Sequence, residues 1–360
     1  MPKRQSASTS LGENTQILLA SRPAAEPSLA NFRVAHSVIP LPERGEVLLR
    51  TLYLSLDPYM RARMNASGSY AAPVEVGKVM TGGTVAEVVE SKHDDFATGD
   101  VVLAHTGWQT YGVQAGAQLR KLSSATAPYS TALGVLGMPG FTAYAGLKEI
   151  GRPGAGETVV VAAASGPVGS TVGQLARMAG ARVVGIVGGP IKADYIKQLG
   201  FDEAVDHRAP DFGQQLEHAT PDGIDVYFEN VGGRVWDHVL PRLNTYARVP
   251  VCGLVSTYNC AGPVDGSPSA GVLTATILRK SITLRGFIQT ESSSTPTTRD
   301  SSKRRPRGSA TALCGTARTS SMDWRKPLPP SWECSGGAGG ENFGKLIVRV
   351  AAQTPSGEKK

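Results

Sequence analysis

The sequence has few cysteines and no long apolar run. Only four of its 360 residues are cysteine, none lies before Cys252, and none belongs to the C-x-x-C pairs of structural zinc sites. A small disulfide-stapled module is therefore excluded, and structural zinc is not expected. No apolar run approaches the roughly 20 residues of a membrane-spanning helix, so we expect no membrane partner.

The amino-terminal residues also lack the apolar stretch of a signal peptide. Residues 1–14 are polar, and we predict a flexible tail and a cytoplasmic protein. With 41% apolar and 19% charged residues, the composition is that of a globular protein. A chain of 360 residues exceeds the usual size of one core, so two domains are expected.

The positive charge is concentrated in residues 292–339. This segment holds eight basic and three acidic side chains, which accounts for five of the net charge of +7. It is rich in Ser, Thr, Pro and Arg and lacks the apolar periodicity of the chain on either side. The segment is therefore anomalous.

Three interpretations of residues 292–339 are open. The first is a disordered, solvated insertion. The second is a nuclear or nucleic-acid patch at residues 303–307, KRRPR, although short basic runs match by chance often, and we expect no nucleic-acid partner. The third is a shifted reading frame: residues 322–326, MDWRK, require codons such as ATG GAY TGG AGR AAR, and reading two nucleotides later gives Gly-Leu-Glu and then Lys or Glu.

The hydrophobic pattern predicts an α/β protein with a second, β-rich domain. Residues 15–132 show short apolar runs separated by Gly, Pro and Asp, which is typical of many short strands. Residues 133–291 alternate apolar strands with helical segments, which predicts a Rossmann-type, doubly wound parallel sheet. Residues 340–360 include a further strand pattern that we expect to return to the β-rich domain.

A glycine-rich turn follows the first strand of the α/β region. Residues 162–173 read AAASGPVGSTVG, with Ala164 in the first glycine position, then Gly166 and Gly169. Small residues allow a tight turn and close approach of a pyrophosphate to the helix amino terminus. Because the turn joins a buried strand to a helix, we predict dinucleotide binding over a purely structural turn.

The end of the second strand indicates which dinucleotide is bound. NAD-binding proteins usually carry an acidic residue there for the ribose 2′-hydroxyl, whereas this chain has Gly188 and Lys192 and no acid. A lysine can bind the 2′-phosphate of NADP(H), which is the predicted cofactor. The alternative is that Lys192 is an ordinary solvated lysine.

Seven motifs together resemble the medium-chain dehydrogenase/reductase superfamily. The chain is most similar to its zinc-free branch of prostaglandin reductases, leukotriene hydroxydehydrogenases and alkenal double-bond reductases. The resemblance covers residues 16–291 and resumes at residue 340. The motifs are LSLDPYMRARM (54–64), GWQTYGV (107–113), LGMPGFTAYAGL (136–147), AASGPVG (163–169), YFENVGG (227–233), CGLVSTYN (252–259) and NFGKLIVRV (342–350).

The resemblance also bears on the anomalous segment. In such proteins a segment similar to DGLEKAP precedes N-F-G-K, and this is what the shifted frame from Met322 spells. The resemblance therefore favours a frameshift.

The resemblance implies a GroES-like domain formed by residues 15–132 and 340–360, and an NADP-binding Rossmann domain formed by residues 133–291. It implies Tyr258 as the catalytic residue and a homodimer. Tyr59, Trp108 and Tyr111 are expected to line the substrate pocket, although each could equally belong to a core. The expected cofactor-binding residues are Gly166, Pro167, Val168, Gly169, Gly188, Lys192, His207, Asn230, Cys252, Gly253, Ser256, Tyr258, Phe287, Ile288, Gln289 and Asn342.

Two departures qualify these implications. The family usually has a tyrosine where this chain has His207. A histidine can also donate to a phosphate, but lone histidines are more often structural. Zinc-dependent relatives need Cys and His ligands in the β-rich domain, which has no cysteine here, so no metal is expected.

The resemblance therefore implies NADPH-dependent reduction of the carbon–carbon double bond of small-molecule enals or enones. Hydride would reach the β-carbon, and a donor such as the Tyr258 hydroxyl would stabilise the enolate oxygen. The alternative is a non-enzymatic or inactivated NADPH-binding protein, in which residues 292–339 disrupt the cleft.

Overall fold

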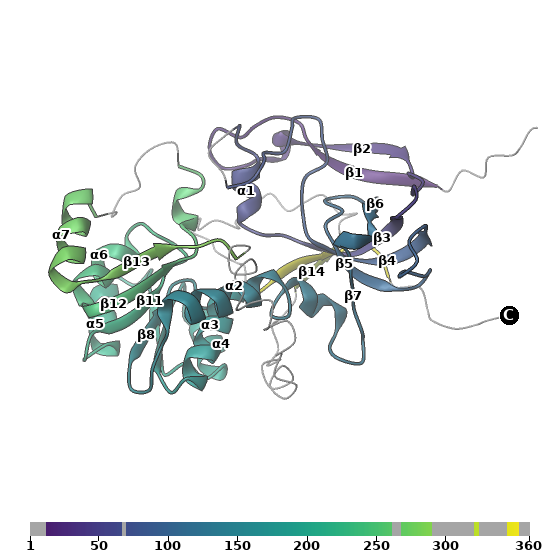
Figure 1. The fold of residues 1–360 in the computed structure, drawn as a ribbon. Coiled ribbons are helices and arrows are strands. Elements are labelled where there is room, and N and C mark those ends of the chain that lie inside the picture. Colours follow the sequence, from purple (N-terminus) through teal and green to yellow (C-terminus); the bar gives the residue numbers. More distant parts are fainter. Residues whose placement is uncertain (1–11, 67–69, 261–267, 290–319, 324–343, 353–360) are drawn as a thin grey trace, which may run out of the picture.

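A computed structural model describes residues 12–66, 70–260, 268–289, 320–323 and 344–352. An α/β unit and a β-rich unit lie side by side (Figure 1). The predicted fold class, a doubly wound parallel sheet with a GroES-like β-rich domain, is confirmed.

The α/β unit contains a six-stranded parallel sheet with the strand order β10-β9-β8-β11-β12-β13. Strands β8 and β9 consist largely of Val and Ile, as expected for strands that are covered on both faces. From β8 the chain winds outward through β9 and β10 and then returns to β11 on the other side of β8. The strands are β8 (Thr158–Val161), β9 (Arg182–Val187), β10 (Glu203–Asp206), β11 (Ile224–Phe228), β12 (Leu243–Val251) and β13 (Thr283–Gly286).

Helices cover both faces of this sheet. One core cluster joins the sheet to α2, α3 and α4, and another joins it to α5, α6 and α7. Ligand sites in such folds lie at the carboxyl ends of the strands where the winding reverses, here between β8 and β11. The helices are α2 (Met138–Gly146), α3 (Pro167–Met178), α4 (Pro190–Gln198), α5 (Phe212–Ala219), α6 (Val235–Val239) and α7 (Ala270–Lys280).

The β-rich unit is built around the long strand β3, which pairs with β4, β6 and β15. Strand β15 comes from the other end of the chain and pairs antiparallel with β3, with Val348 opposite Leu54. The described carboxyl-terminal residues therefore return to this unit. The strands are β1 (Glu13–Leu19), β2 (Phe32–Val38), β3 (Glu46–Ser55), β4 (Thr84–Ser91), β5 (Val101–Ala104), β6 (Tyr111–Ala115), β7 (Arg120–Lys121), β14 (Ser320–Asp323) and β15 (Leu346–Arg349).

Three helical segments differ from the sequence pattern. The short helix α1 (Tyr59–Arg63) follows Pro58 in a region that the pattern describes only as strands and turns. Helix α6 spans only five residues of the alternating strand and helix pattern, because Pro241 lacks an N–H and the chain continues as a 3₁₀ turn. Helix α7, whose amino terminus is capped by the Ser269 hydroxyl, was not predicted at all.

Candidate functional site

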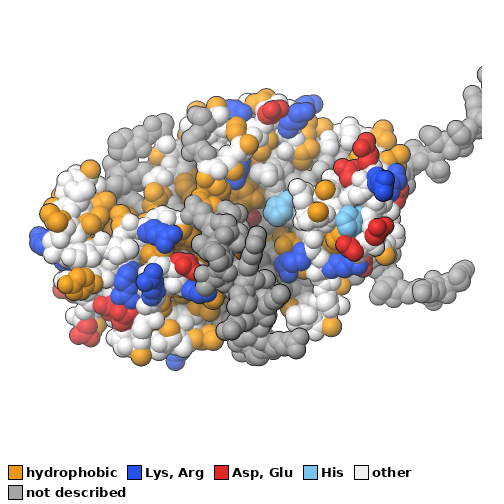
Figure 2. All heavy atoms as spheres, in the orientation of Figure 1, with side chains coloured by type: hydrophobic (Ala, Val, Ile, Leu, Met, Phe, Trp, Pro, Cys, Tyr) orange, Lys and Arg blue, Asp and Glu red, His pale blue; other side chains and the backbone are white. Residues whose placement is uncertain are grey.

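A cavity of about 1660 Å³ lies between the two units. One wall consists of turns at the carboxyl ends of β8, β9, β11 and β12, and the other consists of α1, the end of β3 and the start of β15. The cavity therefore lies where the topology predicts a ligand site. On the face shown in Figure 2, the basic and acidic side chains of the described residues are interspersed over both units.

The glycine turn contributes to the part of the cavity lining that comes from the α/β unit. Helix α3 begins after Gly166, with Pro167 at its first position and no side chain among the described residues capping its free N–H groups. A Cβ on Gly169 would lie 2.5 Å from the carbonyl oxygen of Ala163, so no side chain fits there. Gly166, Pro167, Val168 and Gly169 all line the cavity. Open N–H groups at a helix amino terminus are suited to a phosphate.

Cationic side chains gather next to this turn, at the end of β9. A Cβ on Gly188 would lie 2.9 Å from Nε of Arg208 and 3.1 Å from Nε2 of His207, so the absence of a side chain leaves room for both. Burial first, and then Arg208, lower the pKa of both Lys192 and His207. Arg234 also lowers the pKa of His207 and lines the cavity. Such a concentration of positive charge is suited to a second anionic group.

The turns after β11 and β12 are bound to each other by backbone hydrogen bonds. The amides of Cys252 and Gly253 both donate to the carbonyl of Glu229, at 2.9 and 3.2 Å. The Ser256 hydroxyl donates to the carbonyl of Val231 at 2.6 Å. The Asn230 side chain donates to the carbonyl of Ala162 at 2.8 Å, which connects these turns to the glycine turn.

The Glu229 side chain stabilises the turn after β11 through hydrogen bonds. Its side chain is fully buried and accepts hydrogen bonds from the amides of Val231 and Gly232 and from the Tyr227 hydroxyl. Burial raises its pKa, although these donors act in the opposite direction. Burial, and then Glu229, raise the pKa of the Cys252 thiol to about 12, so Cys252 is a neutral thiol and a poor nucleophile at neutral pH.

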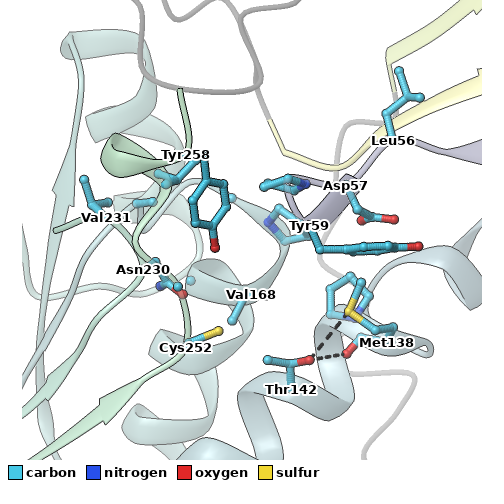
Figure 3. A pocket seen from close by; sticks show the side chains of 18 of the residues that line it. Leu56, Asp57, Tyr59, Met138, Thr142, Val168, Asn230, Val231, Cys252 and Tyr258 are labelled. Carbon is cyan, nitrogen blue, oxygen red and sulfur yellow. Dashed lines mark hydrogen bonds between the residues drawn. The ribbon is translucent and has the colours of Figure 1, made fainter. Parts of the chain in front are cut away.

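Two tyrosines face the cavity from opposite walls, as Figure 3 shows. Tyr258 comes from the turn after β12 and directs its hydroxyl into the space above Asn230 and Val168, and Tyr59 extends from the start of α1. Burial raises the pKa of both hydroxyls. Both tyrosines therefore remain protonated and can donate a hydrogen bond through the neutral pH range.

A buried ion pair completes the β-rich wall. Nζ of Lys345 lies 2.7 Å from Oδ1 of Asp57, and the two side chains are only 5% and 6% exposed. Lys345 also donates to the carbonyl of Leu56, and the Ser55 hydroxyl donates to Asp57. The pair connects the start of β15 to the segment between β3 and α1.

Known proteins resemble the chain over two thirds or more of its length. The NADPH-dependent curcumin reductase of Escherichia coli K12 is 48% identical over 344 residues, which are 94% of this chain and 97% of that protein. Prostaglandin reductase 1 of Rattus norvegicus is 42% identical over 73% of this chain and 78% of that protein. The NADP(+)-dependent 2-alkenal reductase of Nicotiana tabacum is 44% identical over 68% and 74%.

Family profiles match both units. The profile described as the N-terminal domain of oxidoreductase matches residues 15–122, and the profile described as zinc-binding dehydrogenase matches residues 167–302. The chain belongs to the medium-chain dehydrogenase/reductase family. It falls in the branch that includes the prostaglandin reductases and alkenal reductases, as its motifs predict.

Solved structures of this family superpose well on the chain. CurA from Vibrio vulnificus has a TM-score of 0.83 and 44% identity, over 95% of this chain and 100% of that chain. CurA in complex with NADPH has a TM-score of 0.83 and 45% identity, over 94% and 99%.

The cavity brings together most of the residues that the motifs single out. Tyr59 and all the expected cofactor-binding residues except Asn342 line it, and Asn342 lies outside the described residues. Their individual roles remain predictions.

Two of the expected pocket residues lie elsewhere. Trp108 is 3% exposed and packs in a core cluster with Leu54 and Met60, with its ring stacked on Phe32 at 5.6 Å. Tyr111 lies on β6 opposite Arg50 of β3. Neither is among the residues that line the cavity. Trp108 belongs to the core of the β-rich unit and Tyr111 to β6, and a pocket role for either residue stays a prediction.

Other site residues were not found from the sequence. Arg208 follows His207 directly and could have been found by scanning beyond the expected position for a cation. The Asp57–Lys345 pair joins two quoted motifs, but nothing in the sequence indicates that they meet. Glu229 is part of YFENVGG, where an acid before a glycine pair is a weak signal for a buried acceptor.

Two further properties concern metals and membranes. In the described ranges, no three His, Cys, Asp or Glu side chains are grouped so that they could hold a metal ion. No helix within the described part of the chain is both long and apolar enough to span a membrane.

Proposed function

We propose that this chain uses NADPH to reduce the carbon–carbon double bond of α,β-unsaturated aldehydes or ketones. One observation carries the proposal: a single cavity joins a dinucleotide cradle to the Tyr258 hydroxyl. The names of the relatives support it, since they include an NADPH-dependent curcumin reductase and an NADP-dependent 2-alkenal reductase.

The residues of the α/β wall fit NADPH. The open amino terminus of α3, at Gly166 to Gly169, would hold the pyrophosphate. Lys192, Arg208 and His207 would hold the 2′-phosphate. The linked turns at Asn230 and residues 252–258 would receive the nicotinamide end. When bound, NADPH supplies a hydride for the β-carbon of the substrate.

Tyr258 is the proposed catalytic residue. As negative charge develops on the carbonyl oxygen of the substrate, the protonated Tyr258 hydroxyl donates a hydrogen bond to that oxygen and stabilises the enolate. Burial keeps this hydroxyl protonated, because it raises the pKa of Tyr258 above its ordinary value. A proton must then reach the α-carbon, from Tyr258 or from solvent.

We propose that this reaction needs no zinc. The proposal rests on the sequence, in which residues 15–132 contain no cysteine. It also rests on Tyr258, whose hydroxyl can stabilise the carbonyl oxygen that zinc-dependent relatives polarise with the metal. Loss of activity on treatment with a chelator, restored by zinc, would contradict it.

A homodimer and a cytoplasmic location also remain proposals. The edge strand β13 is exposed along its whole length, and Leu278 and Val272 of the neighbouring α7 are 83% and 55% exposed. Exposed edge strands pair readily with a second copy, which supports a dimer through this edge. Light scattering of the purified chain measures its mass directly.

We propose further that residues 292–339 are read out of frame. Within this segment the structure describes only β14, which pairs parallel with β15. The proposal rests on the shifted codons and on the family resemblance. Sequencing the gene between the codons for Glu291 and Gly340 tests it, and an unambiguous in-frame sequence would refute it.

The activity is tested by NADPH oxidation with the 360-residue chain. The substrates are a medium-chain 2-alkenal and an acyclic enone, with the saturated aldehyde and NADH as controls. We expect turnover only with NADPH and conjugated substrates, and a kcat about 100-fold lower in Tyr258→Phe, as for the loss of one oxyanion donor. A folded chain that binds NADPH without turnover would instead be an inactivated cofactor-binding protein.

A further inference from the structure

Arg61 is a half-buried residue in the middle of α1, two positions after Tyr59. Its guanidinium donates to the carbonyl of Pro23 at 3.4 Å and to the carbonyl of Ala25 at 2.9 Å. It also donates to Oδ1 of Asn65 at 2.6 Å. These acceptors all belong to the β-rich unit, and they fix the orientation of the planar guanidinium within it.

A further hydrogen bond of this guanidinium crosses to the α/β unit. Nε of Arg61 donates to Oδ1 of Asn259 at 3.1 Å, although the two residues are 198 positions apart in the sequence. Hydrogen bonds from a cation are stronger than those between neutral groups, and this one is partly buried. The contact therefore holds the residue that follows Tyr258 against α1.

Tyr258 lies between two such attachments. It directly follows a short 3₁₀ turn after β12. The Ser256 hydroxyl donates to the carbonyl of Val231 at 2.6 Å, which attaches the start of the turn to the α/β unit. Asn259 attaches the end of the turn to Arg61. The backbone on either side of Tyr258 is thus bound to a different unit.

The position of the Tyr258 hydroxyl depends on this turn. The hydroxyl points into the cavity (Figure 3), and a Cβ on Gly253 would lie only 3.2 Å from it, so the ring packs close to the backbone of the same segment. Misplacing a catalytic group by about 1 Å can lower a rate on the order of 100-fold. A shift of Asn259 relative to α1 would therefore change the reaction without removing any group from the cavity.

We propose that Arg61 is a positioning residue: through Asn259 it holds the turn that carries Tyr258, so that the Tyr258 hydroxyl meets the carbonyl oxygen of the substrate. The inference rests on the proposed function, because it concerns the hydrogen-bond donor of that reaction. Helix α1 then contributes to the site twice, since Tyr59 lines the cavity and Arg61 supports the tyrosine on the opposite wall.

The test removes the acceptor, so that Arg61 keeps its contacts within the β-rich unit. Asn259→Ala is expected to lower kcat for a 2-alkenal about tenfold, as the loss of one charged hydrogen bond implies, while the Kd of NADPH stays at its wild-type value. Asn259→Asp still offers an oxygen to Arg61 and should retain most of the activity. Arg61→Met should cause a loss similar to that of Asn259→Ala, and the double variant should lose no more, because both changes remove one contact.

The matched control is Asn65→Ala. It removes another side-chain acceptor of the same arginine, at 2.6 Å, but this acceptor lies on the β-rich side and does not adjoin Tyr258. We expect it to keep the wild-type kcat. An equal loss in Asn65→Ala and Asn259→Ala, or a wild-type kcat in both, would overturn the inference while leaving the proposed function intact.

A second background separates positioning from a general structural role. Tyr258→Phe lacks the hydroxyl that is to be positioned, so adding Asn259→Ala to it should lower kcat no further. Losses that multiply in the double variant would overturn the inference, because Asn259 would then act independently of the Tyr258 hydroxyl.

A measurement without substrate covers the case in which the wild-type chain does not reduce the alkenal, which would contradict the proposed function. Hydrogen exchange of the backbone amides of residues 252–260 is compared in the wild-type chain, Asn259→Ala and Asn65→Ala. Exchange of the Tyr258 and Cys260 amides at least about tenfold faster in Asn259→Ala alone would support the attachment of the turn to Arg61. Equal exchange in all three chains would overturn it.

Discussion

The α/β wall of the cavity is made largely of backbone, whereas the β-rich wall is made of side chains. Gly166, Gly169 and the turns after β11 and β12 present N–H and C=O groups held by short-range hydrogen bonds. The opposite wall presents Tyr59, Arg63 and the Asp57–Lys345 pair. Backbone suits a cofactor with invariant phosphates, whereas side chains can differ with the substrate while the fold is retained.

The largest effect is expected where the backbone wall has no spare room. Gly169→Val would place a side chain against the carbonyl of Ala163, where even a Cβ lies only 2.5 Å away. We expect NADPH binding to weaken more than about 1000-fold, or about 4 kcal/mol, in a fluorescence titration. The control is Gly154→Ala, whose Cβ meets its nearest atom at 3.7 Å and should bind NADPH normally. Near-normal binding by Gly169→Val would mean that this turn is not the cofactor cradle.

The next effect concerns the side-chain wall. Lys345→Met leaves Asp57 buried without its partner and should lower the free energy of unfolding by about 3–5 kcal/mol, whereas combining it with Asp57→Asn should recover part of the loss. Lys121→Met is the matched control: its ion pair with Asp100 has the same 2.7 Å separation but is partly exposed, so a loss of at most about 1 kcal/mol is expected. Urea unfolding measures all four chains, and equal losses in the two lysine variants would contradict a special role for the buried pair.

A third prediction separates the two ends of the backbone wall. Arg208→Gln and Lys192→Gln should each reduce the preference for NADPH over NADH about tenfold, because each removes a cation near the expected 2′-phosphate. Lys197→Gln on the same helix α4 serves as the control, since Lys197 is directed to Glu203 at 2.8 Å and does not line the cavity. Steady-state kinetics with NADPH and with NADH measures this preference as the ratio of the two kcat/KM values. An unchanged ratio in all three variants would place the 2′-phosphate elsewhere.

The smallest effect is a pH dependence of stability caused by Glu229. Burial raises the pKa of Glu229 in the folded chain above its value in the unfolded chain, so the folded state binds the proton more tightly. The contribution of Glu229 to the free energy of unfolding should therefore be greatest below its ordinary pKa of about 4.3 and should decline as pH rises through the raised value.

Urea unfolding at several pH values between 4.5 and 7 measures this effect. Glu229→Gln cannot ionise and lacks this contribution, so the wild-type chain should lose stability relative to the variant as pH rises. A difference that is constant across this range would mean that Glu229 is not perturbed by its burial.

The two walls also differ in how well the sequence predicts them. The glycine turn and Lys192 follow the ends of strands that the apolar pattern identifies, and parallel strands bring their carboxyl ends to one edge. This part of the cofactor wall could therefore be predicted from local patterns, whereas Asn230 and Tyr258 were expected there only because of the family resemblance. Arg208 was missed because its position after β10 depends on a side chain folding back toward Gly188.

The side-chain wall depends on contacts that sequence patterns do not encode. Asp57 and Lys345 are 288 residues apart and meet only because β15 pairs with β3. Trp108 was expected in the pocket because of the family resemblance, but a large apolar ring packs equally well in a core, and here its ring stacks on Phe32. Helix α1, which carries Tyr59 and Arg63, is too short to produce a helical pattern.

The central claim is that the two walls together direct hydride to the β-carbon of a conjugated carbonyl compound. The most direct measurement uses NADPH deuterated at C4 of the nicotinamide with a 2-alkenal, and locates the label in the product by NMR. The account predicts a saturated aldehyde with deuterium at the β-carbon and a solvent-derived hydrogen at the α-carbon. Deuterium at the carbonyl carbon of an unsaturated alcohol would contradict it and would show that the cavity reduces the carbonyl group instead.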